Sequence, residues 1–220
     1  MKESIDPIWE ELHSQLEWGQ YPSEHVIRFI ARNYYKTDRS KVRILDFGAG
    51  AGAHTWYLAR EGFDTYAFDG SKSAINKIKR KLDKEGLEAH LSVMDAVVVG
   101  YPEEFFDAVV DNLCIYANTL SNIEIMYENV YKMLKRGGQL LTVCFSKDTT
   151  GYGFGDEIEK DTFRNITEGF LMHRGTTHFF DIQTLNCLLE NIGFRNIHND
   201  IIMHTDNDSK IEHIITIAVK

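Results

Sequence analysis

The sequence predicts an α/β protein in which a doubly wound, mostly parallel sheet carries helices on both faces. Short apolar runs alternate with helical repeats from residue 41 to residue 146, and this alternation requires parallel strands joined by crossover helices. The runs are apolar throughout, which is typical of strands buried on both faces. The 220 residues, of which 43% are hydrophobic, are enough for one domain.

Two helices are expected before the sheet begins. Apolar residues recur at helical spacing between residues 9 and 16 and again between residues 26 and 30. Pro22 and Ser23 separate the two groups, and Ser23 is a suitable N-cap for the second helix.

The sheet is then expected to form in sequence order. Strands are predicted at residues 42–47, 63–69, 87–95, 105–113 and 139–145. Helices are predicted at residues 53–61, 71–85 and 123–135, the second capped by Ser71 and the third ended by Gly137 and Gly138.

The last third of the chain departs from this alternation. Residues 147–170 form a long irregular stretch with glycines among charged and aromatic residues. A helix is expected from about Asp181, followed by two strands around the turn TDNDSK at residues 205–210. Because the ending is a hairpin, the last strand must run antiparallel to its neighbour.

Composition excludes several classes of protein. The chain has 24 basic and 33 acidic side chains and a net charge of −9, so its surface should repel phosphate backbones and a nucleic-acid partner is not expected. The basic stretch at residues 72–84 is interrupted by apolar residues at helical spacing and is interpreted as a solvated helix face. No apolar run approaches the ~20 residues that span a bilayer, so stable membrane insertion is not expected.

The three cysteines have no CxxC spacing and apolar neighbours. They are interpreted as core thiols in a reducing compartment, and a cytoplasmic protein is expected.

The stretch ILDFGAGAGAHT, residues 44–55, contains Gly48, Gly50 and Gly52 directly after the first strand. Glycine permits positive φ and lets a ligand lie against the backbone at a helix N-terminus. In a doubly wound sheet this turn lies at the ligand-binding edge. Asp69 ends the second strand, where a carboxylate accepts hydrogen bonds from ribose hydroxyls. An adenosine-bearing cofactor is therefore predicted.

Asp46 distinguishes between two cofactors of this kind. The glycines also satisfy the loose dinucleotide pattern GxGxxG/A. A carboxylate at the strand end would repel a pyrophosphate by about 1 kcal/mol in a water-like dielectric. The same carboxylate would attract the sulfonium and ammonium groups of S-adenosylmethionine, which is the predicted cofactor.

Five motifs carry a family resemblance: DFGAGAG, YAFDGSKSAI, MDA, DNLCIY and LKRGGQLLTV, between residues 46 and 143. They resemble the class I S-adenosylmethionine-dependent methyltransferases. That resemblance implies a seven-stranded sheet of order 3-2-1-4-5-7-6 with strand 7 antiparallel. It also implies a cofactor-binding set: Asp46, Gly48, Ala49, Gly50 and Gly52 for the methionine portion, Asp69 and Gly70 for the ribose, Asp95 and Ala96 for the adenine, and Asn112 and Leu113 near the methyl group.

Each acidic member of this set has a structural alternative. Asp46 can cap the turn that follows it, Asp69 can cap the helix that Ser71 also serves, and Asp95 can belong to an ordinary turn. These alternatives stay open at the level of sequence.

The flanking segments narrow the resemblance. Residues 18–36 and 178–194 are similar to small bacterial methyltransferases related to tellurite resistance and surface-polysaccharide modification. This similarity implies a small-molecule acceptor, either a small polar molecule or a sugar, methylated on a hydroxyl or an amine.

Methyl transfer from a sulfonium is an in-line displacement that needs alignment and exclusion of water. A hydroxyl acceptor also benefits from a base. The sequence offers five candidates, of which His178 and Tyr116 are chosen as catalytic: His173, His178, His54, Tyr116 and Tyr21. The acceptor-binding candidates lie outside the common core and are Trp18, Tyr21, Tyr152 and Arg174. No metal is expected, because Lys147 stands where a carboxylate ligand would be needed after the fifth strand.

The prediction is one methyltransferase domain over residues 1–220. It comprises an N-terminal helical cap (1–40), a cofactor-binding core (41–146), a lid or substrate insertion (147–180) and a C-terminal helix and hairpin (181–220).

Two alternative functions remain. Tyr131 and Lys135 have the Tyr-x-x-x-Lys spacing of NAD(P)-dependent short-chain reductases, but we expect both on the helix that enters the fifth strand, far from the ligand edge. A non-catalytic cofactor-binding protein is the second alternative, because a fold does not fix an activity.

Overall fold

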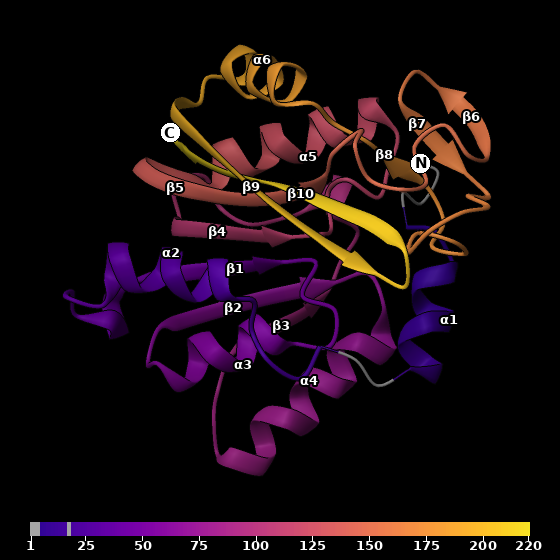
Figure 1. The fold of residues 1–220 in the computed structure, drawn as a ribbon. Coiled ribbons are helices and arrows are strands. Elements are labelled where there is room, and N and C mark those ends of the chain that lie inside the picture. Colours follow the sequence, from indigo (N-terminus) through magenta and orange to yellow (C-terminus); the bar gives the residue numbers. More distant parts are fainter. Residues whose placement is uncertain (1–4, 17–18) are drawn as a thin grey trace.

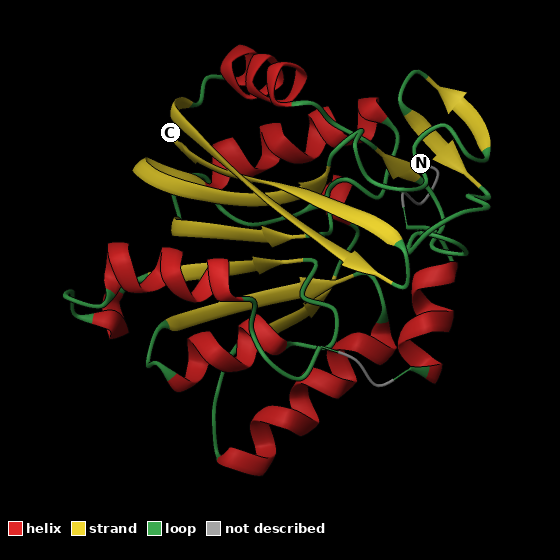
Figure 2. Ribbon diagram, viewed as in Figure 1, coloured by secondary structure: helices red, strands yellow, loops and turns green. Residues whose placement is uncertain are grey.

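The structure is a computed structural model that describes residues 5–16 and 19–220. The described residues form a seven-stranded sheet with helices on both faces (Figure 1, Figure 2). The strand order is β3-β2-β1-β4-β5-β10-β9, and β10 is antiparallel to both of its neighbours. This confirms the predicted fold class, strand order and reversed strand.

The strands of the sheet are β1 (Arg43–Phe47), β2 (Asp64–Asp69), β3 (His90–Val93), β4 (Phe106–Asn112), β5 (Leu134–Phe145), β9 (Arg195–Asp206) and β10 (Ser209–Val219). The helices are α1 (Ile8–Gln15), α2 (Glu24–Tyr34), α3 (Ala53–Arg60), α4 (Lys72–Glu85), α5 (Leu120–Met133) and α6 (Ile182–Ile192), with short 3₁₀ turns η1 (Arg39–Lys41) and η2 (Ala96–Val98).

Alternate residues of the central strands face the two helical layers. Leu45 of β1 belongs to the apolar cluster that includes α5 and α6, whereas its neighbour Ile44 belongs to the cluster that includes α2 and α3. Both clusters are buried, which explains why the strands are apolar throughout.

The register brings the carboxyl ends of the central strands together. In β1, which lies between β2 and β4, Phe47 pairs with Phe68 on one side and with Asp111 on the other. From β1 the chain continues to β2 on one side of it, and later forms β4 on its other side. The carboxyl ends of β1 and β4 therefore mark the switch point at which doubly wound sheets bind ligands.

The boundary between α5 and β5 differs from the prediction. The helix ends at Met133, and Leu134 already pairs with Phe106 in the sheet. Lys135 therefore lies on β5 and not on the helix, where its Nζ contacts Asp107 Oδ2 at 2.7 Å. The buried Leu134 and this ion pair favour extended backbone several residues before the glycines that were expected to end the helix.

The insertion, residues 147–180, contains a second sheet that was not predicted. Its strands are β6 (Asp156–Glu159), β7 (Thr162–Arg164) and β8 (Thr177–His178), in that order. The Phe163 and Phe179 side chains are buried and pack near each other. The insertion is joined to the main sheet by a hydrogen bond from Phe180 N to Phe145 O at 3.0 Å.

The cysteine prediction is correct only in part. Cys144 is buried and Cys114 is partly buried, but Cys187 is exposed on α6, where the amide of Asn191 contacts its sulfur. The core-thiol prediction is wrong for Cys187, because it lies on the solvent side of an amphipathic helix.

Across residues 5–16 and 19–220, the helices are too short or too polar to span a lipid bilayer.

Candidate functional site

A cavity of about 350 Å³ lies at the carboxyl ends of β1, β2 and β4. Eleven of the residues predicted from the sequence line it: Gly48, Ala49, Gly50, Gly52, Asp69, Gly70, Ala96, Asn112, Leu113, Tyr116 and Arg174. The structure thus brings together the glycine loop, the end of β2 and two residues chosen for catalysis or acceptor binding.

The glycine loop presents bare backbone to this cavity. Gly48, Gly50 and Gly52 have φ of +67°, +53° and +79°, a region that favours glycine. A Cβ on Gly48 would lie 2.1 Å from the sulfur of Cys114, so this position also lacks space for a side chain. Gly52 is the N-cap of α3, and the loop therefore ends at a helix N-terminus.

Asp69 connects the loop to the end of β2. Its Oδ2 accepts a hydrogen bond from Gly50 N, and its Oδ1 accepts one from Ser71 N, both at 2.8 Å. A carboxylate has about four acceptor positions, so these two contacts leave capacity for a ligand. Asp69 both shapes the loop and lines the cavity.

Asp46 lies beneath the loop and does not line the cavity. Its side chain is 2% exposed, and its Oδ2 accepts a hydrogen bond from Thr55 Oγ1 at 2.6 Å. Thr55 is in the first turn of α3, so this contact links the end of β1 to the start of that helix. Burial raises the pKa of Asp46 to about 7. Its expected direct contact with the cofactor therefore lacks geometric support, and any influence on a ligand acts through space.

Asp95 likewise has turn contacts. Its Oδ1 accepts a hydrogen bond from Val97 N at 2.9 Å and caps η2. Ala96 lines the cavity, whereas Asp95 is not part of the lining.

Asp111 holds the turn that follows β4. Its buried carboxylate accepts hydrogen bonds from Cys114 N and Ile115 N and from Thr142 Oγ1, the last at 2.6 Å. Leu113 in this turn has φ of +64°. These bonds offset an unfavourable backbone conformation and fix the segment that lines the cavity from Asn112 to Asn118.

Asn112 is oriented by a residue of α2. His25 Nε2 donates to Asn112 Oδ1 at 2.6 Å. Because the amide oxygen is engaged, the amide NH₂ is the group that Asn112 can offer to a ligand.

The two catalytic candidates have different positions. Tyr116 lines the cavity, and its ring packs edge-on against Phe145 with a centroid distance of 4.8 Å. Burial raises the pKa of Tyr116, so its phenol stays protonated at neutral pH and can donate a hydrogen bond.

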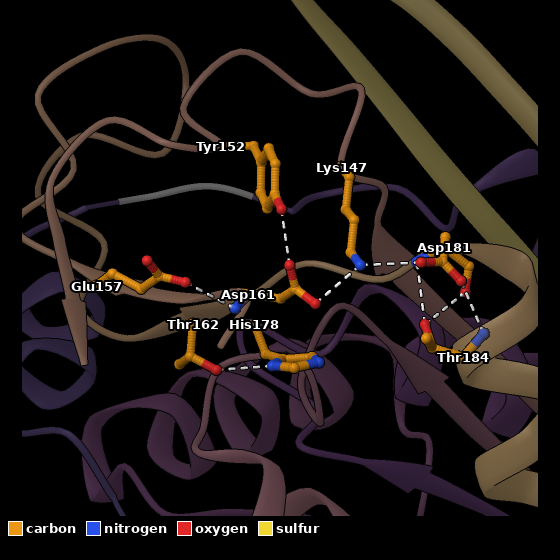
Figure 3. Close-up of polar contacts among 8 residues, drawn as sticks. All are labelled: Lys147, Tyr152, Glu157, Asp161, Thr162, His178, Asp181 and Thr184. Carbon is orange, nitrogen blue, oxygen red and sulfur yellow. Dashed lines mark hydrogen bonds and ion pairs between the residues drawn. The ribbon is translucent and has the colours of Figure 1, made fainter. Parts of the chain in front are cut away.

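His178 does not reach the cavity. It is 5% exposed, and its Nδ1 is hydrogen-bonded to Thr162 Oγ1 at 2.7 Å within the insertion (Figure 3). Burial lowers the pKa of His178 to about 4. Its backbone N–H donates to Tyr116 O at 2.9 Å. The expectation that His178 acts as the base therefore lacks geometric support, because His178 is outside the cavity lining and its imidazole is engaged within the insertion.

Among the acceptor-binding candidates, Arg174 alone lies in the cavity lining of the described residues. The Tyr152 hydroxyl donates to Asp161 Oδ1 at 2.7 Å (Figure 3), and its ring packs against the buried Phe163 and Phe179. Tyr21 is 81% exposed and outside the lining. Trp18 lies outside the described residues. The assignments of Tyr152 and Tyr21 are thus not supported by the geometry.

A charged cluster fastens the insertion to the main domain. Lys147, directly after β5, contacts Asp161 Oδ2 at 2.8 Å and Asp181 Oδ2 at 2.9 Å (Figure 3). Asp181 also caps α6 by accepting from Thr184 N. Lys147, which argued against a metal site in the sequence, therefore links the segment after β5 to the middle of the insertion and to the start of α6.

The sequence did not reveal that α1 covers the cavity. Ile5, Asp6, Trp9 and His13 all line it. Glu10 of the same helix accepts hydrogen bonds from the hydroxyls of Ser71 and Ser73 at the start of α4. The helical repeat of α1 was visible in the sequence, but its docking partner is remote in the chain.

His54, one of the five candidate bases, also lines the cavity. The lining further includes residues that were not predicted, among them Cys114, Asn118, Phe145 and Phe170. Within residues 5–16 and 19–220, no three His, Cys, Asp or Glu side chains are placed to hold a metal ion.

Comparisons with known proteins found a matching family and several similar proteins. A family described as "Methyltransferase domain" matches residues 44–138. The PKS-NRPS hybrid synthetase cheA of Chaetomium globosum is 27% identical over 195 residues, which are 81% of this chain but 4% of the synthetase. The ubiquinone/menaquinone biosynthesis C-methyltransferase UbiE of Pectobacterium carotovorum is 25% identical over 181 residues, which are 73% of this chain and 69% of that protein.

A solved structure shares the fold. The Burkholderia thailandensis 1,6-didemethyltoxoflavin-N1-methyltransferase, with 1,6-didemethyltoxoflavin and S-adenosylhomocysteine bound, has a TM-score of 0.68 and 17% identity, and the match covers 90% of this chain and 77% of that one.

Proposed function

Because this chain belongs to the class I S-adenosylmethionine-dependent methyltransferases, we propose that it methylates a small molecule bound in the cavity at the carboxyl ends of β1, β2 and β4. The observation that carries this proposal is that one cavity is lined both by the glycine loop and by Tyr116 and Arg174. A cofactor and an acceptor bound there would share a single enclosed space, as direct transfer between them requires.

The residues of the cavity fit this cofactor. The loop offers backbone where a Cβ on Gly50 would meet only His13, at 3.4 Å. The Asp69 carboxylate suits ribose hydroxyls, and the two acids of the lining, Asp6 and Asp69, suit a cationic ligand better than a diphosphate. We assign the cofactor to Gly48, Ala49, Gly50, Gly52, Asp69, Gly70, Ala96, Asn112 and Leu113.

When bound, S-adenosylmethionine supplies a methyl group activated by a sulfonium. The chain's own residues have three tasks. The glycine loop and Asp69 orient the cofactor, α1 excludes water from above through Trp9, and Tyr116 donates a hydrogen bond to the acceptor. Since Tyr116 stays protonated, we assign it an orienting role and not that of a base.

The relatives support a small-molecule acceptor. UbiE is named for C-methylation in quinone biosynthesis and the Burkholderia enzyme for N-methylation of a toxoflavin precursor. The atom that is methylated therefore varies among similar proteins. Within this class we propose a small polar molecule or a sugar that accepts the methyl group on a hydroxyl or an amine.

The test is transfer of a labelled methyl group. Purified protein is incubated with methyl-labelled S-adenosylmethionine and a metabolite extract, and the products are separated by mass. We expect label in a low-mass product, suppressed by excess S-adenosylhomocysteine. Label found only in protein or RNA would contradict the proposal. Oxidation of NADH without label transfer would favour the reductase alternative, and cofactor binding without turnover the non-catalytic one.

A further inference from the structure

We propose that the acceptor carries an oxyanion, either a carboxylate or a phosphate, which Arg174 binds while the rest of the acceptor lies against a row of aromatic side chains. This inference rests on the proposed function, since it concerns the acceptor end of the same cavity. It specifies a chemical class that the proposed function leaves open.

Charge within the cavity is the first observation. Among the described residues that line it, Arg174 is the one lysine or arginine, whereas Asp6 and Asp69 are acids. His13 and His54 also line the cavity, and burial lowers the pKa of both imidazoles. In a chain with a net charge of −9, a cationic side chain at this place marks a preference for a negatively charged ligand group.

The orientation of Arg174 is the second observation. Its guanidinium carbon lies 4.5 Å from the ring centroid of Phe170, which also lines the cavity. Stacking uses the face of the guanidinium, whereas its five N–H donors lie in its plane and match a carboxylate or phosphate in pairs.

The third observation is the aromatic row itself. Phe170 lies 6.4 Å from Phe145 between ring centroids, and Phe145 lies 4.8 Å from Tyr116. All three rings line the cavity. Arg174 stands at one end of this row, and Tyr116, in the turn after β4, stands at the other. An apolar, planar acceptor with an oxyanion at one end matches this arrangement.

A structural role toward α1 is the competing interpretation. Asp6 also lines the cavity, and a Cβ on Gly175 would lie 2.7 Å from its Oδ2. Asp6 accepts a hydrogen bond from Ile8 N at the start of α1. If Arg174 served only to attract Asp6, replacing either residue would have the same effect on ligand binding.

The experiment uses protein saturated with S-adenosylhomocysteine, whose own binding is measured first by calorimetry. The protein is then titrated with benzoate, phenyl phosphate and the neutral benzamide. We expect at least one anion to bind about tenfold or more tightly than benzamide. The stronger of the two anions distinguishes a carboxylate from a phosphate acceptor.

Variants assign the preference to its residue. Arg174→Gln should abolish the preference for anions, and Arg174→Lys should keep part of it, because the charge remains without the planar fork. Arg136→Gln is the matched control: it removes the same charge from an exposed side chain at the opposite end of β5. Asp6→Asn should retain or increase the preference.

The proposal is overturned if the wild-type protein binds the anions no more tightly than benzamide, or binds no anion at millimolar concentration. It is also overturned if Arg174→Gln keeps the full preference for anions over benzamide, or if Asp6→Asn loses that preference. If Arg174→Gln does not fold, Arg174→Lys and Asp6→Asn decide. Failure to bind S-adenosylhomocysteine would instead count against the proposed function.

Discussion

The Asp69 side chain has two roles: it accepts a hydrogen bond from the glycine loop, and it is the proposed partner of the ribose hydroxyls. Removing it leaves Gly50 N without its acceptor and takes away the proposed partner of the ribose. We predict that Asp69→Ala weakens S-adenosylmethionine binding by about 1 to 3 kcal/mol, the range for lost hydrogen bonds to a charged group.

Calorimetric titration measures this loss. Asp64→Ala is the control, because Asp64 begins the same strand and contacts Arg43, away from the cavity. Equal affinity in the Asp69 variant and the wild type would remove the ribose assignment.

Asp46 makes stability depend on pH. Burial raises its pKa from 3.8 to about 7. As pH rises from about 4 to about 7, the unfolded chain loses this proton while the folded protein keeps it, so the free energy of unfolding falls. Above both pKa values the penalty is constant. Asp46→Asn cannot ionise, and we predict that it loses less stability across this window, by about 2 to 4 kcal/mol.

Urea unfolding of both proteins at about pH 4.5 and about pH 7.5 tests this sign. Asp111, whose pKa burial raises to about 6, is present in both proteins and cancels in the comparison. If the free energy of unfolding changed equally with pH in the wild type and in Asp46→Asn, Asp46 would be ionised in the folded protein across this range.

Tyr116 and His178 should respond differently to substitution. Tyr116→Phe removes a hydroxyl at the cavity and is predicted to slow transfer about tenfold or more while leaving cofactor affinity unchanged. His178→Ala removes one of the two hydrogen-bond partners of the buried Thr162 hydroxyl, the other being Glu159. It is predicted to cost about 1 to 3 kcal/mol of stability. It should leave the pH dependence of kcat unshifted. Loss of the acidic limb of that profile, where protonation of a base lowers kcat, would restore His178 as the base.

Site residues could be predicted from the sequence where neighbouring residues alone determine their role. Gly48 to Gly52 and Asp69 could be predicted because a bare turn and a strand-end acid are fixed by a few adjacent residues. The orientations of His178 and Tyr152 could not, since they depend on packing among strands β7 and β8, which are only three and two residues long.

At the scale of elements, α1 closes the cofactor end of the cavity. Its attachment to α4 includes the Glu10 carboxylate, which accepts from the hydroxyls of Ser71 and Ser73. We predict that Glu10→Ala loosens this cover and accelerates S-adenosylhomocysteine dissociation about three- to tenfold, with little change in the stability of the sheet.

Stopped-flow dissociation measures the rate. Glu11→Ala is the matched control on the same helix, because the Glu11 carboxylate accepts a hydrogen bond from Gln15 within α1. If both variants release the ligand at the wild-type rate, Glu10 does not hold the cover in place.

The elements could be predicted to different degrees. Ser71, which accepts from Ala74 N, caps α4 where the sequence indicated. The start of β5 was misplaced because the glycines at 137 and 138 are a strong local signal, whereas the pairing of Leu134 with Phe106 is a contact between distant residues. The small sheet of the insertion was missed because its strands are too short for a periodic pattern.

At the scale of the molecule, cofactor binding should stabilise the whole domain. The cavity is walled by α1, the main sheet and the insertion, so a ligand there binds only the folded state. S-adenosylhomocysteine at about 100 times its Kd adds about 2.7 kcal/mol. For a chain of this size we predict a rise in Tm of about 5 to 10 °C.

Scanning fluorimetry with a hydrophobic dye measures this shift. NADH at the same concentration is the comparison and should leave Tm unchanged, because the acids near the cavity disfavour a diphosphate. An equal shift with NADH would support the dinucleotide alternative.

The sheet order could be anticipated because the motifs resemble a family whose strand order is known, whereas the reversed last strand followed from the terminal hairpin itself. Contacts between segments that are far apart in the sequence could not be predicted. The cover formed by α1 and the attachment of the insertion through Lys147 both belong to that class (Figure 1, Figure 3).

The position of Trp9 gives the protein an optical reporter of its own. Its indole forms part of the cavity wall, so an arriving ligand alters the surroundings of that chromophore and hence its emission. Trp56 is outside the wall, with Arg60 and Lys81 at 5.1 and 5.0 Å from its ring, and supplies a steadier signal. Titrations can therefore be followed by intrinsic fluorescence, with a Trp9→Phe variant as the blank.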